Sequence, residues 1–176
     1  MVRVRSIRAT ASRYALWPAG RVKVHDGHMT DDAQDSGLAD EREFNRQNIE
    51  EFRNNGGKVG GQFEGFPLLI LTSSGAKSGA ERVNLIAYFD IDDRIYVVGS
   101  AAGRDESPAW VFNLRAHRHV QVEIGSNPKR PVVARELTRE DRDRIYKIIV
   151  ERAPGFAEYE KRTDRVIPIF ELVADN

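Results

Sequence analysis

The chain has 176 residues, a length typical of a single domain that can bury a substantial core. Lysine plus arginine and aspartate plus glutamate each number 27, so the formal net charge is +0 and the basic surplus usual in nucleic-acid-binding proteins is missing. The lack of cysteine excludes disulfides, thiolate metal sites and a cysteine nucleophile, and no apolar run approaches the roughly 18 residues of a membrane span. These features predict a soluble, cytoplasmic protein without a nucleic-acid partner.

The first 39 residues differ from the rest of the chain. No acid precedes Asp26, whereas the same stretch contains the cations Arg3, Arg5, Arg8, Arg13, Arg21 and Lys23. Residues 30–40 are polar and acidic, which is typical of a linker. We therefore expect residues 1–39 to form a basic and then acidic arm, either disordered or partly upstream of a true start at Met29. The alternative interpretation is a peripheral contact of the basic arm with an anionic membrane surface.

Residues 40–176 are predicted to form one domain that begins with a helix and a β-meander. The helix is expected from about Asp40 to Asn54, with Phe44, Ile49 and Phe52 as its apolar positions, and the Asn-Asn-Gly-Gly sequence at 54–57 ends it. Three apolar runs follow, separated by a glycine- and serine-rich turn at 72–79 and an Asp-Asp-Arg turn at 92–94. Apolar runs separated by such short turns indicate three antiparallel strands.

The remaining elements are mostly strands joined by short turns. Ser107-Pro108 predicts the start of a short helix, and strands are expected over 120–124, 132–137 and 168–173. Thr138 is a favourable N-cap for a helix to Arg152 with Ile145, Ile148 and Ile149 buried, and Pro154 separates it from a short helix at 155–159. The fold class is therefore mainly β (α+β), a six-stranded antiparallel split or closed β-barrel with flanking helices.

The first turn of the meander has the composition of an anion site. Its hydroxyls and glycines surround Lys77, and Arg82 follows immediately. A phosphate-binding P-loop is excluded, because the upstream spacing is absent and a strand follows Gly79. The Ser-x-x-Lys tetrad at 74–77 lies on a turn rather than on a helix, and it lacks the partner motifs of serine acyl-transfer enzymes. A phosphate or carboxylate site at Lys77, Ser78 and Arg82 and a simple hairpin with solvated cations both stay open.

The histidines give little support for a metal centre. His117 and His119 lie where they can share one strand face, but no third ligand is near them in the sequence, and the others are His25 and His28. No metal site is therefore predicted.

Several motifs together resemble the deazaflavin-dependent nitroreductase family, the actinobacterial oxidoreductases that use coenzyme F420. The resemblance covers about residues 43–173, and its most specific parts are G-x-[KR]-[ST]-G-x-x-R at 75–82 and P-x-W-x-x-N at 108–113. The family fold is the split β-barrel of flavin-reductase-like proteins. Relatives often carry Arg at the position of Ala76 and Lys or a similar donor at that of Ala101, two points where this chain departs from the pattern.

The resemblance implies roles for individual residues. The basic loop of the family holds the phosphate and oligoglutamate tail of F420, the deazaflavin ring lies against the end of the next strand, and an aromatic wall faces the substrate. Carried over to this chain, the expected cofactor-binding residues are Lys77, Ser78, Gly79, Arg82, Val98, Ser100, Ala101, Gly103 and Trp110. Phe156 and Tyr159 are the expected substrate residues, and Tyr159 is the expected catalytic residue. Packing of Phe156 and Tyr159 onto the barrel is the alternative role.

The expected reaction is transfer of hydride from reduced F420 to a quinone-like, nitroaromatic or other electron-poor small molecule. A redox cofactor that carries the reacting electrons accounts for the lack of a catalytic triad or metal set in the sequence. An FMN-binding reductase on the same barrel and a non-catalytic F420-binding carrier are the alternatives. Barrels of this type often pair, so a homodimer is a further expectation.

Overall fold

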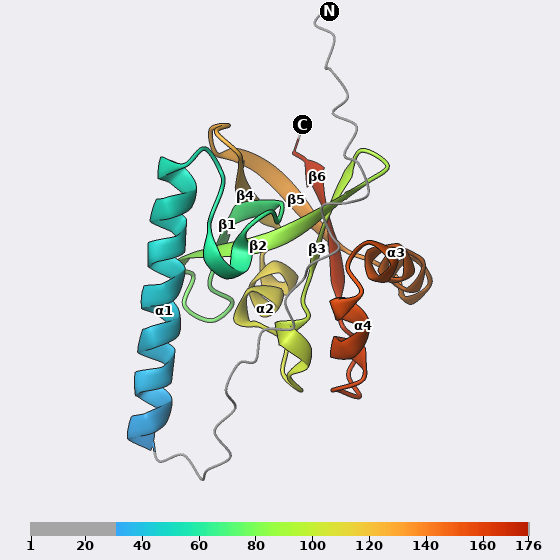
Figure 1. Cartoon of the computed structure of the whole chain (residues 1–176), viewed down its shortest axis with the longest axis horizontal. Coiled ribbons are helices and arrows are strands. Elements are labelled where there is room, and N and C mark those ends of the chain that lie inside the picture. Colours follow the sequence, from blue (N-terminus) through green and yellow to red (C-terminus); the bar gives the residue numbers. More distant parts are fainter. Residues whose placement is uncertain (1–30, 176) are drawn as a thin grey trace, which may run out of the picture.

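The computed structural model describes residues 31–175, with side chains from residue 42 onward, and its centre is a closed antiparallel barrel (Figure 1). The strands follow the order β1-β2-β3-β6-β5-β4 around the barrel. Their bounds are Leu68–Ser74, Glu81–Ile91, Arg94–Val98, His119–Ile124, Arg130–Glu136 and Ile169–Ala174 for β1 to β6. The predicted six-stranded antiparallel barrel with flanking helices is confirmed.

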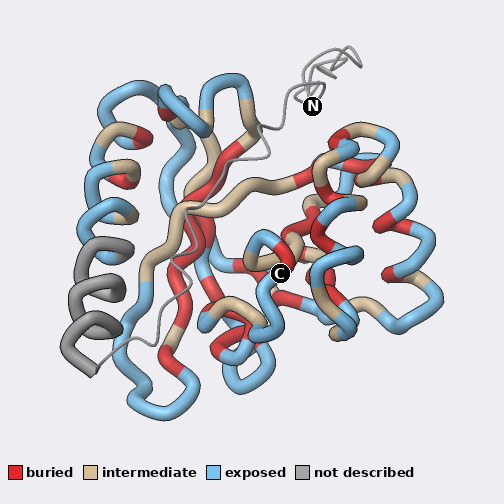
Figure 2. Tube along the Cα trace, turned by 60° about the horizontal axis from the view of Figure 1, so that its bottom comes forward, coloured by how far each residue is buried: buried red, intermediate tan, exposed pale blue. Residues whose placement is uncertain are grey.

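Alternation along the strands divides the core into separate layers. On β1, Leu69 and Leu71 belong to the barrel interior, whereas Leu68 and Ile70 pack against the first helix on the outside. A further cluster joins the barrel to the C-terminal helices, and Figure 2 shows buried residues continuing from the strands into these helices. Both faces of β1 are therefore covered, which explains why its apolar residues form an unbroken run in the sequence.

Helix α1 (Asp31–Asn54) is longer than predicted. It begins at Asp31 rather than near Asp40, so the linker predicted over residues 30–40 is wrong from Asp31 on. Extension of an existing helix adds one hydrogen bond for each residue fixed, and acidic residues are favourable at a helix N-terminus. The predicted end is confirmed: Gly56 and Gly57 have φ of +62° and +87°, and the Gly57 N–H donates to the Phe52 carbonyl at 2.7 Å.

Two kinds of contact hold α1 on the barrel. Of the three apolar positions, Ile49 and Phe52 are buried against β1, while Phe44 is 47% exposed. The Asn45 amide donates to the Val83 carbonyl at 2.8 Å and accepts from the Leu85 N–H at 3.0 Å. Because β3 pairs only with Tyr88–Ile91 of β2, the earlier part of β2 has a free edge, and the Asn45 amide takes the place of a neighbouring strand there.

Helix α2 (Ala109–Ala116) packs with the interior of the barrel, whereas α3 (Arg139–Arg152) and α4 (Gly155–Glu160) belong to the further cluster. Helix α2 follows Pro108, and α3 begins after Thr138, whose hydroxyl accepts from the Asp141 N–H at 3.2 Å as predicted. Two short 3-10 turns, η1 and η2, occupy Gly61–Phe63 and Ala101–Gly103. Of the predicted stripe on α3, Ile145 and Ile149 are buried and Ile148 is partly buried.

The described part of the chain includes no helix with the length and apolar character required to cross a bilayer. The basic segment of the predicted arm, and with it the predicted contact with anionic lipid, lies outside the described residues.

Candidate functional site

The β1–β2 loop is closed by its own backbone. The Gly75 N–H donates to the Ala80 carbonyl and the Gly79 N–H donates to the Gly75 carbonyl, both at 2.8 Å. Gly79 has φ of +66°, which favours glycine, and a Cβ at Gly75 would lie 2.7 Å from the Ser78 Oγ, so that hydroxyl would have to turn away. The loop is therefore a defined hairpin turn rather than an extended bridge.

This loop presents cations and N–H groups that are not used within the described residues. Lys77, Ser78 and Arg82 are exposed. Neither Lys77 nor Arg82 forms an ion pair with another described residue, and the Arg82 guanidinium donates only to the neighbouring Glu81 carbonyl at 3.3 Å. The N–H groups of Lys77 and Ser78 likewise have no acceptor in residues 31–175. Two cations, two amides and a hydroxyl within one turn match the donor set that binds phosphate or carboxylate.

A buried asparagine on α2 fixes this loop. The Asn113 side chain is 7% exposed; its Oδ1 accepts from the Ala76 N–H at 2.9 Å and its Nδ2 donates to the Ser73 Oγ at 3.5 Å. The sequence identified Asn113 only as the end of the P-x-W-x-x-N motif and gave it no role. The structure shows what the asparagine does in that motif: it connects helix α2 to the basic loop.

Replacement of Asn113 by leucine is expected to lower the free energy of unfolding by about 1–3 kcal/mol, because the hydrogen bond between the buried Asn113 side chain and the Ala76 N–H is lost. Urea denaturation measures this loss. Asn113→Asp keeps an acceptor for the Ala76 N–H and is the matched control, expected to retain more stability than Asn113→Leu. Equal stability of wild type and Asn113→Leu would show that Asn113 does not fix the loop.

The turn after β3 has a strained backbone. Val98 ends the strand, and within η2 Ala101, Ala102 and Gly103 have φ of +47°, +54° and +83°. The left-handed conformation costs an alanine about 1–2 kcal/mol, so it persists only where the surroundings hold it. Gly99, just before the turn, is in close contact with α2: a Cβ there would lie 2.6 Å from the Val111 Cγ2.

The guanidinium of Arg165 holds this turn from the loop that precedes β6. It donates to the carbonyls of Gly99 at 3.1 Å, Ser100 at 2.7 Å and Arg104 at 2.8 Å, and to the Ser107 Oγ at 3.2 Å. Burial lowers the pKa of Arg165, but an arginine stays protonated in proteins. Arg165 was not among the predicted site residues, since nothing in its local sequence sets it apart from the other arginines.

Helix α4 packs against the same turn. A Cβ at Gly103 would lie 2.9 Å from the Tyr159 carbonyl oxygen, and the Arg162 guanidinium donates to the Ala102 carbonyl at 3.5 Å. Phe156 and Tyr159 are 3% and 7% exposed, and their ring centroids are 5.3 Å apart. The structure therefore brings the predicted substrate residues to the predicted ring site, but as core side chains; their role toward a substrate stays a prediction.

Trp110 also lies in the core. Its side chain is 7% exposed inside the barrel, and its ring meets that of Phe170 edge to face at a centroid distance of 6.1 Å. This position supports a packing role, and the predicted contact of Trp110 with the cofactor stays untested.

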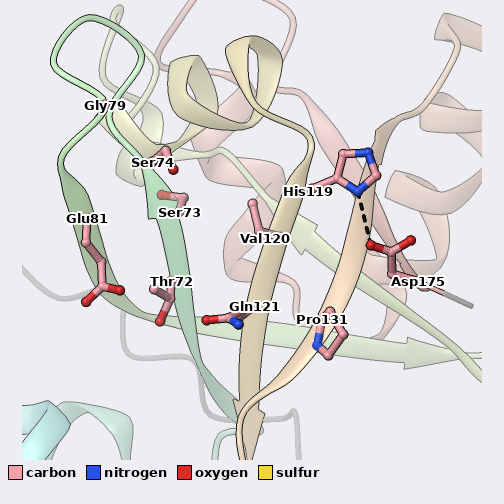
Figure 3. Close-up of a pocket in the computed structure, with 10 residues that line it drawn as sticks. All are labelled: Thr72, Ser73, Ser74, Gly79, Glu81, His119, Val120, Gln121, Pro131 and Asp175. Atoms are coloured by element: carbon pink, nitrogen blue, oxygen red, sulfur yellow. Dashed lines mark hydrogen bonds and ion pairs between the residues drawn. The ribbon is translucent and has the colours of Figure 1, made fainter.

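A cavity of about 340 Å³ lies beside the basic loop, over β1, β4 and β5 (Figure 3). Of the predicted cofactor residues only Gly79 lines it. Its polar side chains include Thr72, whose Oγ1 is buried with no hydrogen-bond partner in the described chain, and His119, whose Nδ1 lies 3.1 Å from the Asp175 Oδ2. The cavity is thus separate from the η2 turn, and the predicted residues at the two loops do not share it.

A family model and two curated relatives all identify the same family of proteins as similar to this chain. The family model described as F420H(2)-dependent quinone reductase matches residues 43–174. The F420H(2)-dependent quinone reductase Rv1261c of Mycobacterium tuberculosis is 33% identical over 126 residues, which is 69% of this chain and 83% of that protein. The putative F420H(2)-dependent quinone reductase Rv3178 of the same species is 32% identical over 106 residues, covering 60% and 88% of the two chains.

Two solved structures are also similar to this chain. A structure described as an F420-H2 dependent reductase (FDR-A) is 36% identical, with a TM-score of 0.54, and the match covers 60% of this chain and 93% of that chain. A second, described as a domain-swapped dimer, is 31% identical, with a TM-score of 0.56 and coverage of 79% and 98%. The chain belongs to the F420H(2)-dependent quinone reductase family.

Proposed function

We propose that this chain is an F420-dependent oxidoreductase that transfers hydride from the reduced deazaflavin to a quinone. Family membership supports the cofactor and the acceptor class. The residues present also fit an F420 molecule: its phosphate and carboxylates need cations and N–H donors, and the β1–β2 loop offers both without using them internally.

The observation that carries this proposal is the place of α2 between the two loops. Asn113, in the second half of the helix, bonds the basic loop at Ala76, and Val111, two residues earlier, contacts Gly99 just before the η2 turn. One helix thus contacts both the basic loop and the segment that leads into the strained turn. Such an arrangement suits an extended ligand with an anionic tail and a flat ring.

Lys77, Ser78, Gly79 and Arg82 would hold the phosphate and oligoglutamate tail, and Val98, Ser100, Ala101 and Gly103 would border the ring. The N–H groups of Ser100 and Ala101 have no acceptor within the described residues, so they are available to the carbonyl oxygens of a deazaflavin. When bound, reduced F420 supplies the hydride. The chain itself needs to bind, orient the acceptor and exclude water.

Tyr159 is the proposed catalytic residue on the acceptor side. Its backbone carbonyl lies against Gly103 of the η2 turn, which places the residue beside the proposed ring site. A phenol is a hydrogen-bond donor, and donation to a quinone oxygen would orient the acceptor and favour the charge that develops on it. Phe156 packs against the Tyr159 ring and would keep it in place.

Titration of the purified protein with F420 and with FMN, followed by steady-state oxidation of reduced F420 with menadione, tests the proposed function. The expected result is saturable F420 binding and turnover with the quinone. Tight FMN binding without F420 binding would identify an FMN reductase, and F420 binding without turnover would identify a carrier; each would overturn the proposal. A homodimer and contact of the N-terminal arm with anionic lipid stay predictions from the sequence.

A further inference from the structure

We propose that Arg165 is the positioning residue of the cofactor loop: its guanidinium holds the η2 turn so that the Ser100 and Ala101 N–H groups are presented to the ring. This inference rests on the proposed function for the identity of the ligand. The hydrogen bonds from Arg165 to the turn are present in the chain without a ligand.

The Arg165 guanidinium forms hydrogen bonds on both sides of the η2 turn. It donates to Gly99 and Ser100 before the three residues of η2 and to Arg104 after them, and its remaining bond reaches Ser107. Both ends of the turn are thus tied to one planar group. An arginine can do this because its donors point in several fixed directions within one plane, which a lysine ammonium cannot reproduce.

Arg165 forms no ion pair with a described residue, although the Asp105 carboxylate favours its charged form. Each of Arg53, Arg115 and Arg142 in this structure forms an ion pair, whereas no ion pair of Arg165 occurs among residues 31–175. Burial of a charged guanidinium costs free energy of desolvation, and hydrogen bonds to carbonyls and a hydroxyl offset this cost. Such an arrangement indicates that the bonds stabilise the fold or the site. Here they hold two alanines in a left-handed conformation that alanine rarely adopts.

The bonds from Arg165 also determine the direction in which two peptide N–H groups point. The C=O and N–H of a trans peptide unit point in opposite directions. Since the carbonyls of Gly99 and Ser100 face Arg165, the N–H groups of Ser100 and Ala101, which belong to the same peptide units, face away from it. Arg165 therefore sets the direction of two adjacent donors without touching the ligand, and its effect on the reaction acts through the turn.

The test compares Arg165→Ala and Arg165→Lys with the wild type and with Arg53→Ala. Arg53 is a matched control because it makes a two-bond contact with Glu123 on another side of the barrel, at 3.0 and 2.7 Å. In the cofactor-free protein, amide hydrogen exchange within residues 100–105 is expected to become at least about tenfold faster in Arg165→Ala at Gly103 and Arg104, whose N–H groups donate within the turn at 2.9 and 3.1 Å, with exchange in the barrel strands unchanged. Arg53→Ala should leave residues 100–105 as in the wild type.

The F420 dissociation constant is expected to rise about 10- to 30-fold in Arg165→Ala, with a smaller rise in Arg165→Lys, whereas the KM for menadione at saturating F420 changes less than twofold. Added guanidinium ion at millimolar concentration should restore part of the F420 affinity of Arg165→Ala, and should have no such effect on Arg53→Ala. If Arg165 only stabilised another part of the fold, added guanidinium ion would not restore the F420 affinity of Arg165→Ala.

Unchanged exchange at residues 100–105 in both Arg165 variants overturns the inference, whether or not F420 binds. Faster exchange at the turn with F420 affinity equal to that of the wild type also overturns it. If the wild type itself does not bind F420, the proposed function fails, whereas the exchange experiment still decides whether Arg165 holds the turn. Should Arg165→Ala not fold, Arg165→Lys supplies the same two measurements.

Discussion

Replacement of both Lys77 and Arg82 by alanine is expected to weaken F420 binding by at least about 100-fold at low salt and to leave the fold intact. A charge-assisted hydrogen bond contributes about 1.5–3 kcal/mol, and exposure to solvent reduces this value. Two such contacts at the lower end give about 3 kcal/mol, which corresponds to more than 100-fold in affinity. Neither side chain forms an ion pair with the described residues, so their removal leaves no acid unpaired.

The measurement is an F420 fluorescence titration at 50 and 300 mM salt, with thermal unfolding in parallel. Salt screens exposed charges, so the wild-type affinity should fall between the two conditions more steeply than that of the double variant. Arg144 and Lys147 on α3 are also exposed, and their double alanine variant is the control with the same change of charge. Equal affinity of the Lys77→Ala/Arg82→Ala variant and the wild type would remove the basic loop from the cofactor site.

The barrel could be predicted because its signals are local. The run at 68–71, the short polar turns and the hydroxyl of Thr138 each act within a few residues of their own position, and all of them are where the sequence placed them. The early start of α1 was missed for the opposite reason. Residues 31–39 lack an apolar stripe, and their helix continues from a segment that is held by contacts further along the chain.

The parts of the site that were missed depend on contacts between distant residues. Arg165 bonds Gly99, and Asn113 bonds Ala76, across 66 and 37 positions of the chain. Arg142 is a similar case: it is 5% exposed, donates to the Ile167 carbonyl at 2.8 Å and lies over the Tyr146 ring. Sequence patterns place arginine at the surface, so a buried guanidinium that satisfies carbonyls is not visible before the fold is known.

Replacement of Phe156 by alanine is expected to lower the free energy of unfolding by about 3–5 kcal/mol, the usual cost of removing a fully buried phenylalanine ring. Phe156 is 3% exposed, and its ring centroid lies 5.3 Å from those of both Phe89 and Tyr159. In a domain of this size the loss corresponds to a fall in melting temperature of about 10 °C. Urea and thermal unfolding measure both quantities.

The same variant separates the two roles predicted for Phe156. A packing role gives the large loss of stability with the menadione KM nearly unchanged well below the melting temperature, since the ring then contacts only the protein. A substrate wall gives a raised KM in addition to that loss of stability. Phe44→Ala is the control: this ring is 47% exposed, and its removal should cost less than about 1 kcal/mol. The Phe156 ring lies between Phe89 of the barrel and Tyr159, so its removal should let the Tyr159 phenol move. A fall in kcat together with the loss of stability would then show that packing in the core positions the residue proposed to contact the acceptor.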